Sequence, residues 1–435
     1  MFLPQSRSIL GRRSITRPSL WQLGITVCST LITASTYIII AHTLHPQAFG
    51  TYMFVQWLAS VTLPIIGIGM STLTSRRAVE IQSNEAPKQS AGIFYFLWYR
   101  QCRCVLLYYG IYLGSTLLLT WAYGFHAPLL LLLAGLATLP LLLSSVASIA
   151  LRSLHRSDLL MMLHLFGILS TFMLVMIASH IDGEHSALLL LASAMATTLT
   201  LIIAVTSVSH LLPMSEAIQP GLFLKERLLR VLKHSPLLFT LDFITWQRSE
   251  LLLLACWRSP VELGFYALSS AISTGTMQIA PTLLSHWILP VFLRYTPGKH
   301  YLNTYDAFVK TSCATVFLAV PICIFVMITC PFIITFCLGV DYLPLVKPLR
   351  ILLIATVFGS TATVSLTHLT SQEHKHEQQW LNMGVAILKI MLVLPCISLW
   401  GMAGAALASA IAQIVSAGGS MLLCRYLLLK YEITT

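Results

Sequence analysis

Long apolar runs separated by short polar segments dominate this 435-residue chain. Apolar stretches of 18 or more residues recur from one end to the other, and each is long enough to cross about 30 Å of hydrocarbon as an α-helix. Backbone amides in lipid must be hydrogen-bonded within their own segment, and the sequence lacks the ten-residue alternation typical of a membrane β-barrel. The pattern therefore predicts an all-α polytopic membrane protein with twelve transmembrane helices. We place them near residues 21–43, 50–73, 104–124, 127–150, 159–180, 186–212, 236–257, 262–293, 309–337, 347–370, 379–399 and 401–428.

A short motif occurs twice and predicts an internal repeat. Residues 46–52 read Pro-x-x-Phe-Gly-x-Tyr, and residues 260–266 read Pro-x-x-Leu-Gly-x-Tyr, each in a short connection between two apolar runs. Tyr52 and Tyr266 lie 214 residues apart, about half of the chain. A helical hairpin repeated in this way predicts two copies of one bundle related by a pseudo-two-fold axis along the membrane normal, an arrangement typical of transporters.

The repeat divides the chain into an N-terminal six-helix lobe over residues 1–212 and a C-terminal six-helix lobe over residues 236–435. The connecting segment, residues 213–235, is expected in the cytoplasm. In it, Leu224, Leu228 and Val231 keep helical spacing opposite a set of basic residues, which predicts an amphipathic helix lying at the membrane surface.

Composition supports the membrane class. Hydrophobic residues make up 57% of the chain and charged residues only 9%, with a mean hydropathy of +0.81. A soluble domain carries about a quarter charged residues. The chain therefore cannot cover itself with a water-compatible surface.

The net charge of +11 is interpreted through its placement. All but five of the 26 Lys and Arg residues lie in, or at the edges of, connections on one predicted side of the membrane. This asymmetry follows the positive-inside rule and predicts a multi-pass protein of the cell inner (cytoplasmic) membrane with both termini in the cytoplasm. The basic excess is thus a topology signal, with membrane lipids and not nucleic acid as the expected partner.

Four charged residues fall inside predicted spans: Asp242, Arg248 and Glu250 in the seventh, and Lys389 in the eleventh. Arg248 and Lys389 lie roughly 15–20 Å from the cytoplasmic end of their helices, close to the midplane. An ionisable group there costs ~2.5 kcal/mol or more unless it is paired or hydrated. Two interpretations stay open: an interhelical ion pair such as Glu250 with Lys389, or a hydrated cavity where the charges contact a substrate or an ion.

Helix geometry restricts how the seventh span can use its charges. Arg248 and Glu250 point about 160° apart around a helix, so they cannot form a local pair facing one cavity. Asp242 and Trp246 share the broad face of Glu250. The candidate substrate-binding residues are therefore Asp242, Trp246, Arg248, Glu250 and Lys389.

Catalytic signatures are absent from the sequence. It contains no Gly-rich phosphate loop, no paired-histidine metal motif on a polar face and no nucleophile elbow. Its ten cysteines include no Cys-x-x-Cys pair. The sequence thus predicts neither an enzyme nor a cofactor nor a metal site.

Several of these segments together resemble a known family. They are the opening hairpin with its turn at residues 46–52 and a Gly67–Gly69 helix ending at Arg76-Arg77, the stretch 246–250 followed by 259–266, and Leu338-Gly-Val-Asp-Tyr342 before the tenth span. Over nearly its whole length the chain resembles the Wzx-type polysaccharide and O-antigen flippases of the multidrug/oligosaccharidyl-lipid/polysaccharide (MOP) exporter superfamily. The resemblance implies a MATE-like fold of two six-helix lobes.

The resemblance also implies a substrate and partners. The expected substrate is an undecaprenyl-pyrophosphate-linked oligosaccharide, flipped to the outer leaflet by alternating access for O-antigen, capsule or exopolysaccharide synthesis. Carried onto this sequence, Arg248 and Lys389 are the cavity cations, and Glu250 and Asp242 are charge partners or sites for a coupling H⁺ or Na⁺. Polysaccharide polymerase and chain-length proteins are further expected partners.

Two rival functions are weighed against the flippase. A MATE-type cation-coupled drug exporter commonly has an acidic residue in its first span, and residues 23–44 contain no Asp or Glu, although Asp242 and Glu250 keep this alternative open. A polysaccharide polymerase or ligase needs a sizeable outer loop for its chemistry, and the predicted outer loops here are too short.

Overall fold

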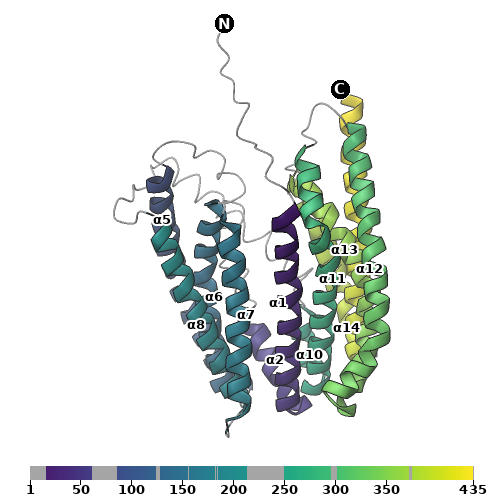
Figure 1. Ribbon diagram of the computed structural model, residues 1–435. Coiled ribbons are helices and arrows are strands. Elements are labelled where there is room, and N and C mark those ends of the chain that lie inside the picture. The colour runs from purple at the N-terminus through teal and green to yellow at the C-terminus, as the bar shows by residue number, and fades with distance from the viewer. Residues whose placement is uncertain are drawn as a thin grey trace.

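The computed structural model describes residues 16–60, 86–123, 128–154, 156–181, 183, 185–212, 249–294, 301–371 and 375–434. Within these ranges all regular structure is helical, as the apolar runs predict (Figure 1). Six of the described helices are long and apolar enough to cross a membrane.

The described helices form two groups, each covering about half of the sequence (Figure 1). The N-terminal group consists of α1 (Thr16–Thr43), α2 (Pro46–Ser60), α5 (Ala86–Tyr123), α6 (Pro128–Ser153), α7 (Ser157–Ser179) and α8 (His185–Leu211). The C-terminal group consists of α10 (Glu250–Trp257), α11 (Pro260–Arg294), α12 (Tyr301–Cys337), the 3₁₀ helix η2 (Val340–Leu345), α13 (Val346–Ser371) and α14 (Lys375–Thr434).

Helix α14 contains two helices joined at a tight bend. Gly401 has φ +57° and ψ −132°, a backbone conformation that side-chain-bearing residues rarely adopt. A Cβ on Gly404 would lie 1.8 Å from the carbonyl oxygen of Cys396, eight positions earlier. In a straight helix those residues would be about 12 Å apart. The chain therefore turns back here, at the boundary predicted between the eleventh and twelfth spans.

Other predicted boundaries lie outside the described residues. The second span is described only to Ser60 and the seventh only from Ser249, and the predicted linker 213–235 is not among the described residues. The count of twelve spans and the lobe boundaries therefore remain predictions.

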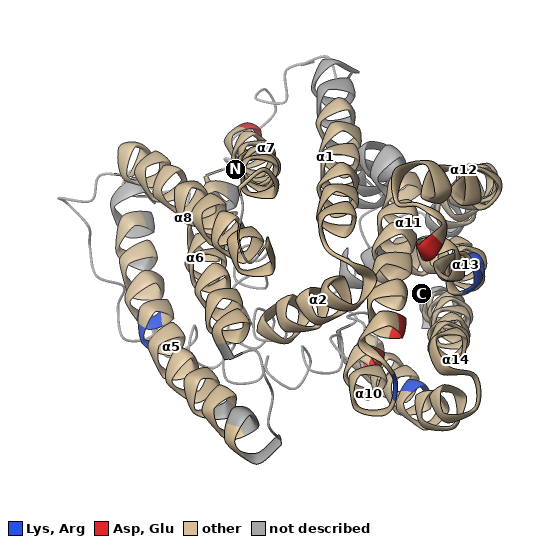
Figure 2. Cartoon of the chain, turned by 90° about the horizontal axis from the view of Figure 1, so that it is seen from below, with Lys and Arg blue, Asp and Glu red and all other residues tan. Residues whose placement is uncertain are grey.

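Packing inside each group follows the repeat. In the N-terminal group α6 packs against α5 and α8, and α1 packs against α7. In the C-terminal group α13 packs against α12 and α14, and α10 packs against α14. The two groups meet mainly where α2 and α1 contact α11 (Figure 2).

The buried core differs between the two ends of the molecule. At the junction end, which contains Pro46 and Pro260 and lies opposite Thr16 and Thr434, one apolar cluster includes residues of both groups (Figure 1). At the termini end each group has its own cluster. Members of these separate clusters are Phe94, Val146, Leu151 and Val208 in the N-terminal group, and Phe308, Val364, Leu369 and Cys424 in the C-terminal group. Among the described residues, the apolar core joins the groups at the junction end only.

The outward surface is apolar, as lipid contact requires. Trp121 on α5 and Phe336 on α12 are 89% and 92% exposed. Leucines such as Leu106 and Leu107 are exposed as well. Soluble monomers seldom expose so many large apolar side chains together, so this surface supports a protein embedded in a bilayer.

Candidate functional site

Two of the five candidate site residues are described, Glu250 at the start of α10 and Lys389 in the first half of α14. Asp242, Trp246 and Arg248 lie outside the described residues, and their roles remain predictions.

Glu250 and Lys389 form a buried ion pair between two helices. The Nζ atom of Lys389 lies 2.8 Å from Oε2 of Glu250, and each side chain is only 3% exposed. Of the two arrangements that the sequence left open, the structure thus contains the ion pair. Each charge neutralises the other where solvent is excluded, because an unpaired charge buried there would be strongly destabilising.

The second carboxylate oxygen of Glu250 is also held by the protein. Its Oε1 atom accepts hydrogen bonds from the hydroxyl of Tyr266 on α11 and from the hydroxyl of Ser409, at 2.6 Å, in the second half of α14. Both donors are buried. The site therefore brings together α10, α11 and both halves of α14.

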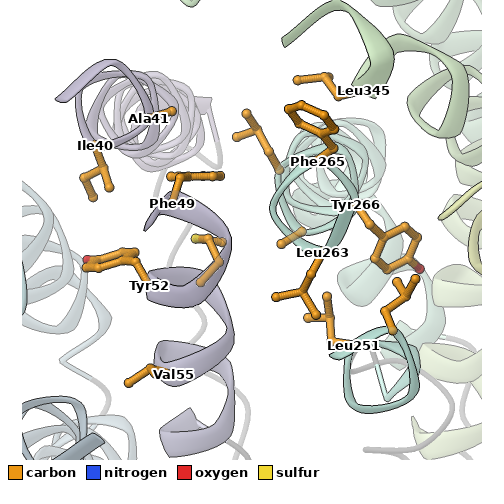
Figure 3. Close-up of a cluster of buried hydrophobic side chains, with 14 of the residues drawn as sticks. Ile40, Ala41, Phe49, Tyr52, Val55, Leu251, Leu263, Phe265, Tyr266 and Leu345 are labelled. Carbon is orange, nitrogen blue, oxygen red and sulfur yellow. The ribbon is translucent and has the colours of Figure 1, made fainter. Parts of the chain in front are cut away.

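Tyr266 and Ser409 are not among the site residues predicted from the sequence. Tyr266 is the last residue of the second repeat motif, and this position in the motif could have identified it as a candidate site residue. In Figure 3 its ring points away from α2, toward the helix that carries Leu251. The serine had no signal, because nothing in an apolar helix of small residues distinguishes Ser409 from its neighbours.

The N-terminal group lacks a matching carboxylate in its first helix. Tyr52, the counterpart of Tyr266, is also buried, but α1 contains no Asp or Glu. The repeat therefore supplies the same scaffold twice, and the described charge pair belongs to the C-terminal copy alone.

A polar face of α14 leads away from the ion pair. Ser409, Gln413, Ser416 and Ser420 follow one another at helical spacing and so share one side of the helix. Ser416 is fully buried. Within the described part of the chain, Gln413 Oε1 and Ser416 Oγ are buried without a hydrogen-bond partner. Such atoms in proteins are normally satisfied by water, so this face favours hydration.

Arg258, at the end of α10, is hydrogen-bonded to the first half of α14. Its guanidinium Nη2 donates to the carbonyl oxygens of Ile397 and Ser398, at 3.0 and 2.9 Å. These carbonyls belong to the last turn before the bend at Gly401, where a helix lacks internal donors and favours positive charge. In Figure 2 charged residues accordingly gather around α10, α11 and α14.

The two repeat motifs contact each other directly. A Cβ on Gly50 would lie 1.7 Å from the carbonyl oxygen of Pro260, and one on Gly264 would lie 2.9 Å from Cα of Gly50. The motif glycines thus allow the backbones of α2 and α11 to contact each other. These are equivalent helices of the two repeats, as expected for a contact at a pseudo-two-fold axis. Figure 3 shows the two helices side by side, with Phe49 and Leu263 among the buried side chains around them.

Within the described residues, no group of three or more His, Cys, Asp or Glu side chains is placed to hold a metal ion.

Comparison with solved structures shows the fold. The chain is similar to a multidrug resistance MATE family transporter of the MOP superfamily in an inward-facing conformation, with a TM-score of 0.74 at 13% identity over 96% of this chain and 99% of that one. It is also similar to the lipid II flippase MurJ in an inward closed conformation, with a TM-score of 0.64 at 13% identity over 95% and 90% of the two chains. A MOP superfamily transporter from Pyrococcus furiosus, described as having a binding pocket of reverse polarity, has a TM-score of 0.61 at 13% identity over 96% of both chains. Such low identity establishes the fold alone.

No protein with a curated description matches the chain. A family model does match it: residues 39–347 fit the family described as "Polysaccharide biosynthesis protein". The match covers most of the chain, and with the structural neighbours it confirms the predicted resemblance to MOP-superfamily polysaccharide flippases and the MATE-like all-α membrane fold. The family match, the fold and the described apolar helices support a multi-pass membrane protein. The chain therefore belongs to the polysaccharide biosynthesis protein family, built on the fold of the MOP-superfamily transporters and flippases.

Proposed function

We propose that this protein flips an undecaprenyl-pyrophosphate-linked oligosaccharide across the cell inner membrane for O-antigen, capsule or exopolysaccharide synthesis. The observation that carries the proposal is the family match, because a polysaccharide-synthesis family on an exporter fold calls for a glycan precursor as cargo. A glycan linked to a lipid pyrophosphate cannot cross hydrocarbon unaided, since burying its charges and hydroxyls is too costly.

Alternating access of the two helix groups is the proposed route. The shared apolar cluster at the junction end and the separate clusters at the termini end support it. With both termini in the cytoplasm, as the positive-inside rule predicts, the described arrangement corresponds to a state closed toward the outside. Rocking of the two groups would then expose the site to the other leaflet.

The proposed headgroup site contains Arg248 and Lys389 as cations. Asp242 and Trp246 are expected on the face of the seventh span that also carries Glu250. Lys389 is already neutralised by Glu250. A pyrophosphate would therefore have to compete with the Glu250 carboxylate for the ammonium group, or a proton on Glu250 would have to release it. In this scheme Glu250 couples H⁺ (or Na⁺) binding to the availability of Lys389.

A MATE-type cation-coupled exporter of small molecules is the second candidate. It is favoured by the likeness to a MATE transporter over nearly the whole chain and by the buried acid Glu250. Fold cannot separate the two candidates, because the exporter and the lipid II flippase are both similar to this chain.

Deletion of the gene tests the proposal. A flippase predicts loss of surface polysaccharide with accumulation of the lipid-linked precursor in the inner membrane, restored by the wild-type gene on a plasmid. Unchanged surface glycan together with increased sensitivity to cationic drugs would reject the flippase and support the exporter. In the flippase case, cross-linking to the polysaccharide polymerase and chain-length proteins then tests them as partners.

A further inference from the structure

Tyr342 in η2 connects the C-terminal helix group to the N-terminal one. Its single hydroxyl proton is shared between the carbonyl oxygen of Ala41, at 2.7 Å, and that of Leu44, at 3.1 Å. Ala41 lies in the last turn of α1 and Leu44 directly follows the helix, at the end where helix carbonyls have no internal donor. A side chain of one group therefore caps a helix of the other.

The ring of Tyr342 lies between aromatic residues of both groups. It makes edge-to-face contacts with Phe49 of α2, at a centroid distance of 6.3 Å, and with Phe265 of α11, at 5.7 Å. Such pairs add to the stabilisation from apolar burial. The residue is 3% exposed, so its hydroxyl has exchanged water for the two carbonyls.

The segment that carries Tyr342 is fixed to its own group. Gly339, with φ +92°, ends α12 in a conformation that favours glycine and starts η2. At the other end of η2, the hydroxyl of Ser269 on α11 donates to the carbonyl oxygen of Leu345 at 3.0 Å. The tyrosine is thus mounted on the C-terminal group and reaches across to α1.

From this geometry we infer that Tyr342 is a latch that keeps the junction end closed. The inference rests on the alternating access of the proposed function. Separating the two groups at this end must break this shared hydrogen bond and withdraw the ring from Phe49. In the open state, water forms hydrogen bonds with the hydroxyl and with the two carbonyls in place of the broken contacts, so the latch is reversible. Its strength helps to set the ratio of closed to open molecules.

The test uses a cysteine reporter in purified protein held in lipid nanodiscs, where reagents reach both faces. All ten native cysteines are replaced, and Ala41, which is 1% exposed in the shared cluster, is changed to cysteine. The rate of reaction with a polar maleimide reports opening of the junction end. Tyr342→Phe keeps the ring and removes the hydroxyl. It is expected to raise the rate roughly 2- to 10-fold, as the loss of one hydrogen bond shared between two carbonyls predicts.

Tyr426→Phe is the matched control, because this α14 tyrosine is 62% exposed and far from the junction end in sequence and in the fold. It should leave the rate unchanged. Tyr342→Ala, checked for monodispersity, removes the ring contacts as well and should give a rate at least as high as Tyr342→Phe. Equal rates in the wild type, Tyr342→Phe and Tyr342→Ala would overturn the latch.

The labelling assay contains no glycan substrate, so it separates the latch from the proposed function. Faster labelling of Tyr342→Phe supports the latch even if gene deletion leaves the surface glycan intact. Unchanged labelling rejects the latch even if deletion abolishes the glycan.

Discussion

At the residue scale, the described part of the chain contains a buried charge pair. Glu250 and Lys389 neutralise each other 2.8 Å apart, with hydrogen bonds from Tyr266 and Ser409 completing the carboxylate. A pair of this kind gives weak net stabilisation when intact but is damaging when one member is lost. That asymmetry makes it possible to separate a structural role from a transport role by experiment.

We predict that Lys389→Ala lowers the free energy of unfolding by about 3–5 kcal/mol, because it leaves the Glu250 carboxylate buried without a counter-charge. The melting temperature of the purified protein measures this. The double variant Glu250→Gln with Lys389→Met removes both charges and should recover most of the lost stability. Cells that express only this double variant should nevertheless lack surface polysaccharide, because Lys389 is needed for transport in the proposed function. Normal polysaccharide in the double variant would mean that the pair is structural only.

At the element scale, the two repeat motifs do more than mark a duplication. Gly50 and Gly264 bring α2 and α11 into backbone contact, and this contact joins the two helix groups. The sequence revealed the repeat from its spacing but gave no sign that the copies touch. That fact depends on how the two groups dock, which no local pattern encodes.

We predict that Gly50→Ala weakens the junction, because its methyl group would lie 1.7 Å from the Pro260 carbonyl oxygen and must push α2 from α11. Overpacking of this kind typically costs 1–3 kcal/mol or more, roughly as in soluble cores. Gly114→Ala on α5 is the control, since nothing lies within 4 Å of its added methyl group. Thermal melting should show a clear loss for Gly50→Ala and little change for Gly114→Ala. A similar melting temperature for both variants would contradict the close contact.

At the scale of the whole molecule, the distribution of the core indicates where motion is possible. The groups share buried side chains at the junction end and have separate cores at the termini end. Relative movement therefore leaves each separate core intact and has to disrupt only the shared cluster, with Tyr342 in it.

We predict that the termini ends of the two groups change their separation when the latch is weakened. Spin labels at Thr206 on α8 and Tyr426 on α14, both exposed, report this distance by pulsed electron paramagnetic resonance. Tyr342→Phe should shift the distance distribution toward shorter values, because opening at the junction end closes the opposite end in alternating access. Distances that are unchanged while the Ala41→Cys reporter reacts faster would argue for local fraying of η2 instead of rocking of the two groups.

The candidate site shows how far sequence reasoning could reach. Depth along a helix follows from counting residues, so Arg248 and Lys389 could be predicted to lie near the midplane. Whether Lys389 met a carboxylate or a cavity depended on the rotation of its helix and on its neighbours. The same limit applied to Ser409, which became a site residue only because α14 turns back at Gly401.

The sequence by itself determined the membrane class, the repeat and the chain reversal between the last two helices. These features follow from transfer of side chains into hydrocarbon, from backbone hydrogen bonding and from residue spacing, which all act locally. Only the tertiary structure decided the partner of Lys389, the meeting of Gly50 with Gly264 and the reach of Tyr342 to α1. Each of these contacts joins residues far apart along the chain, and their free energy appears only after the two groups have packed.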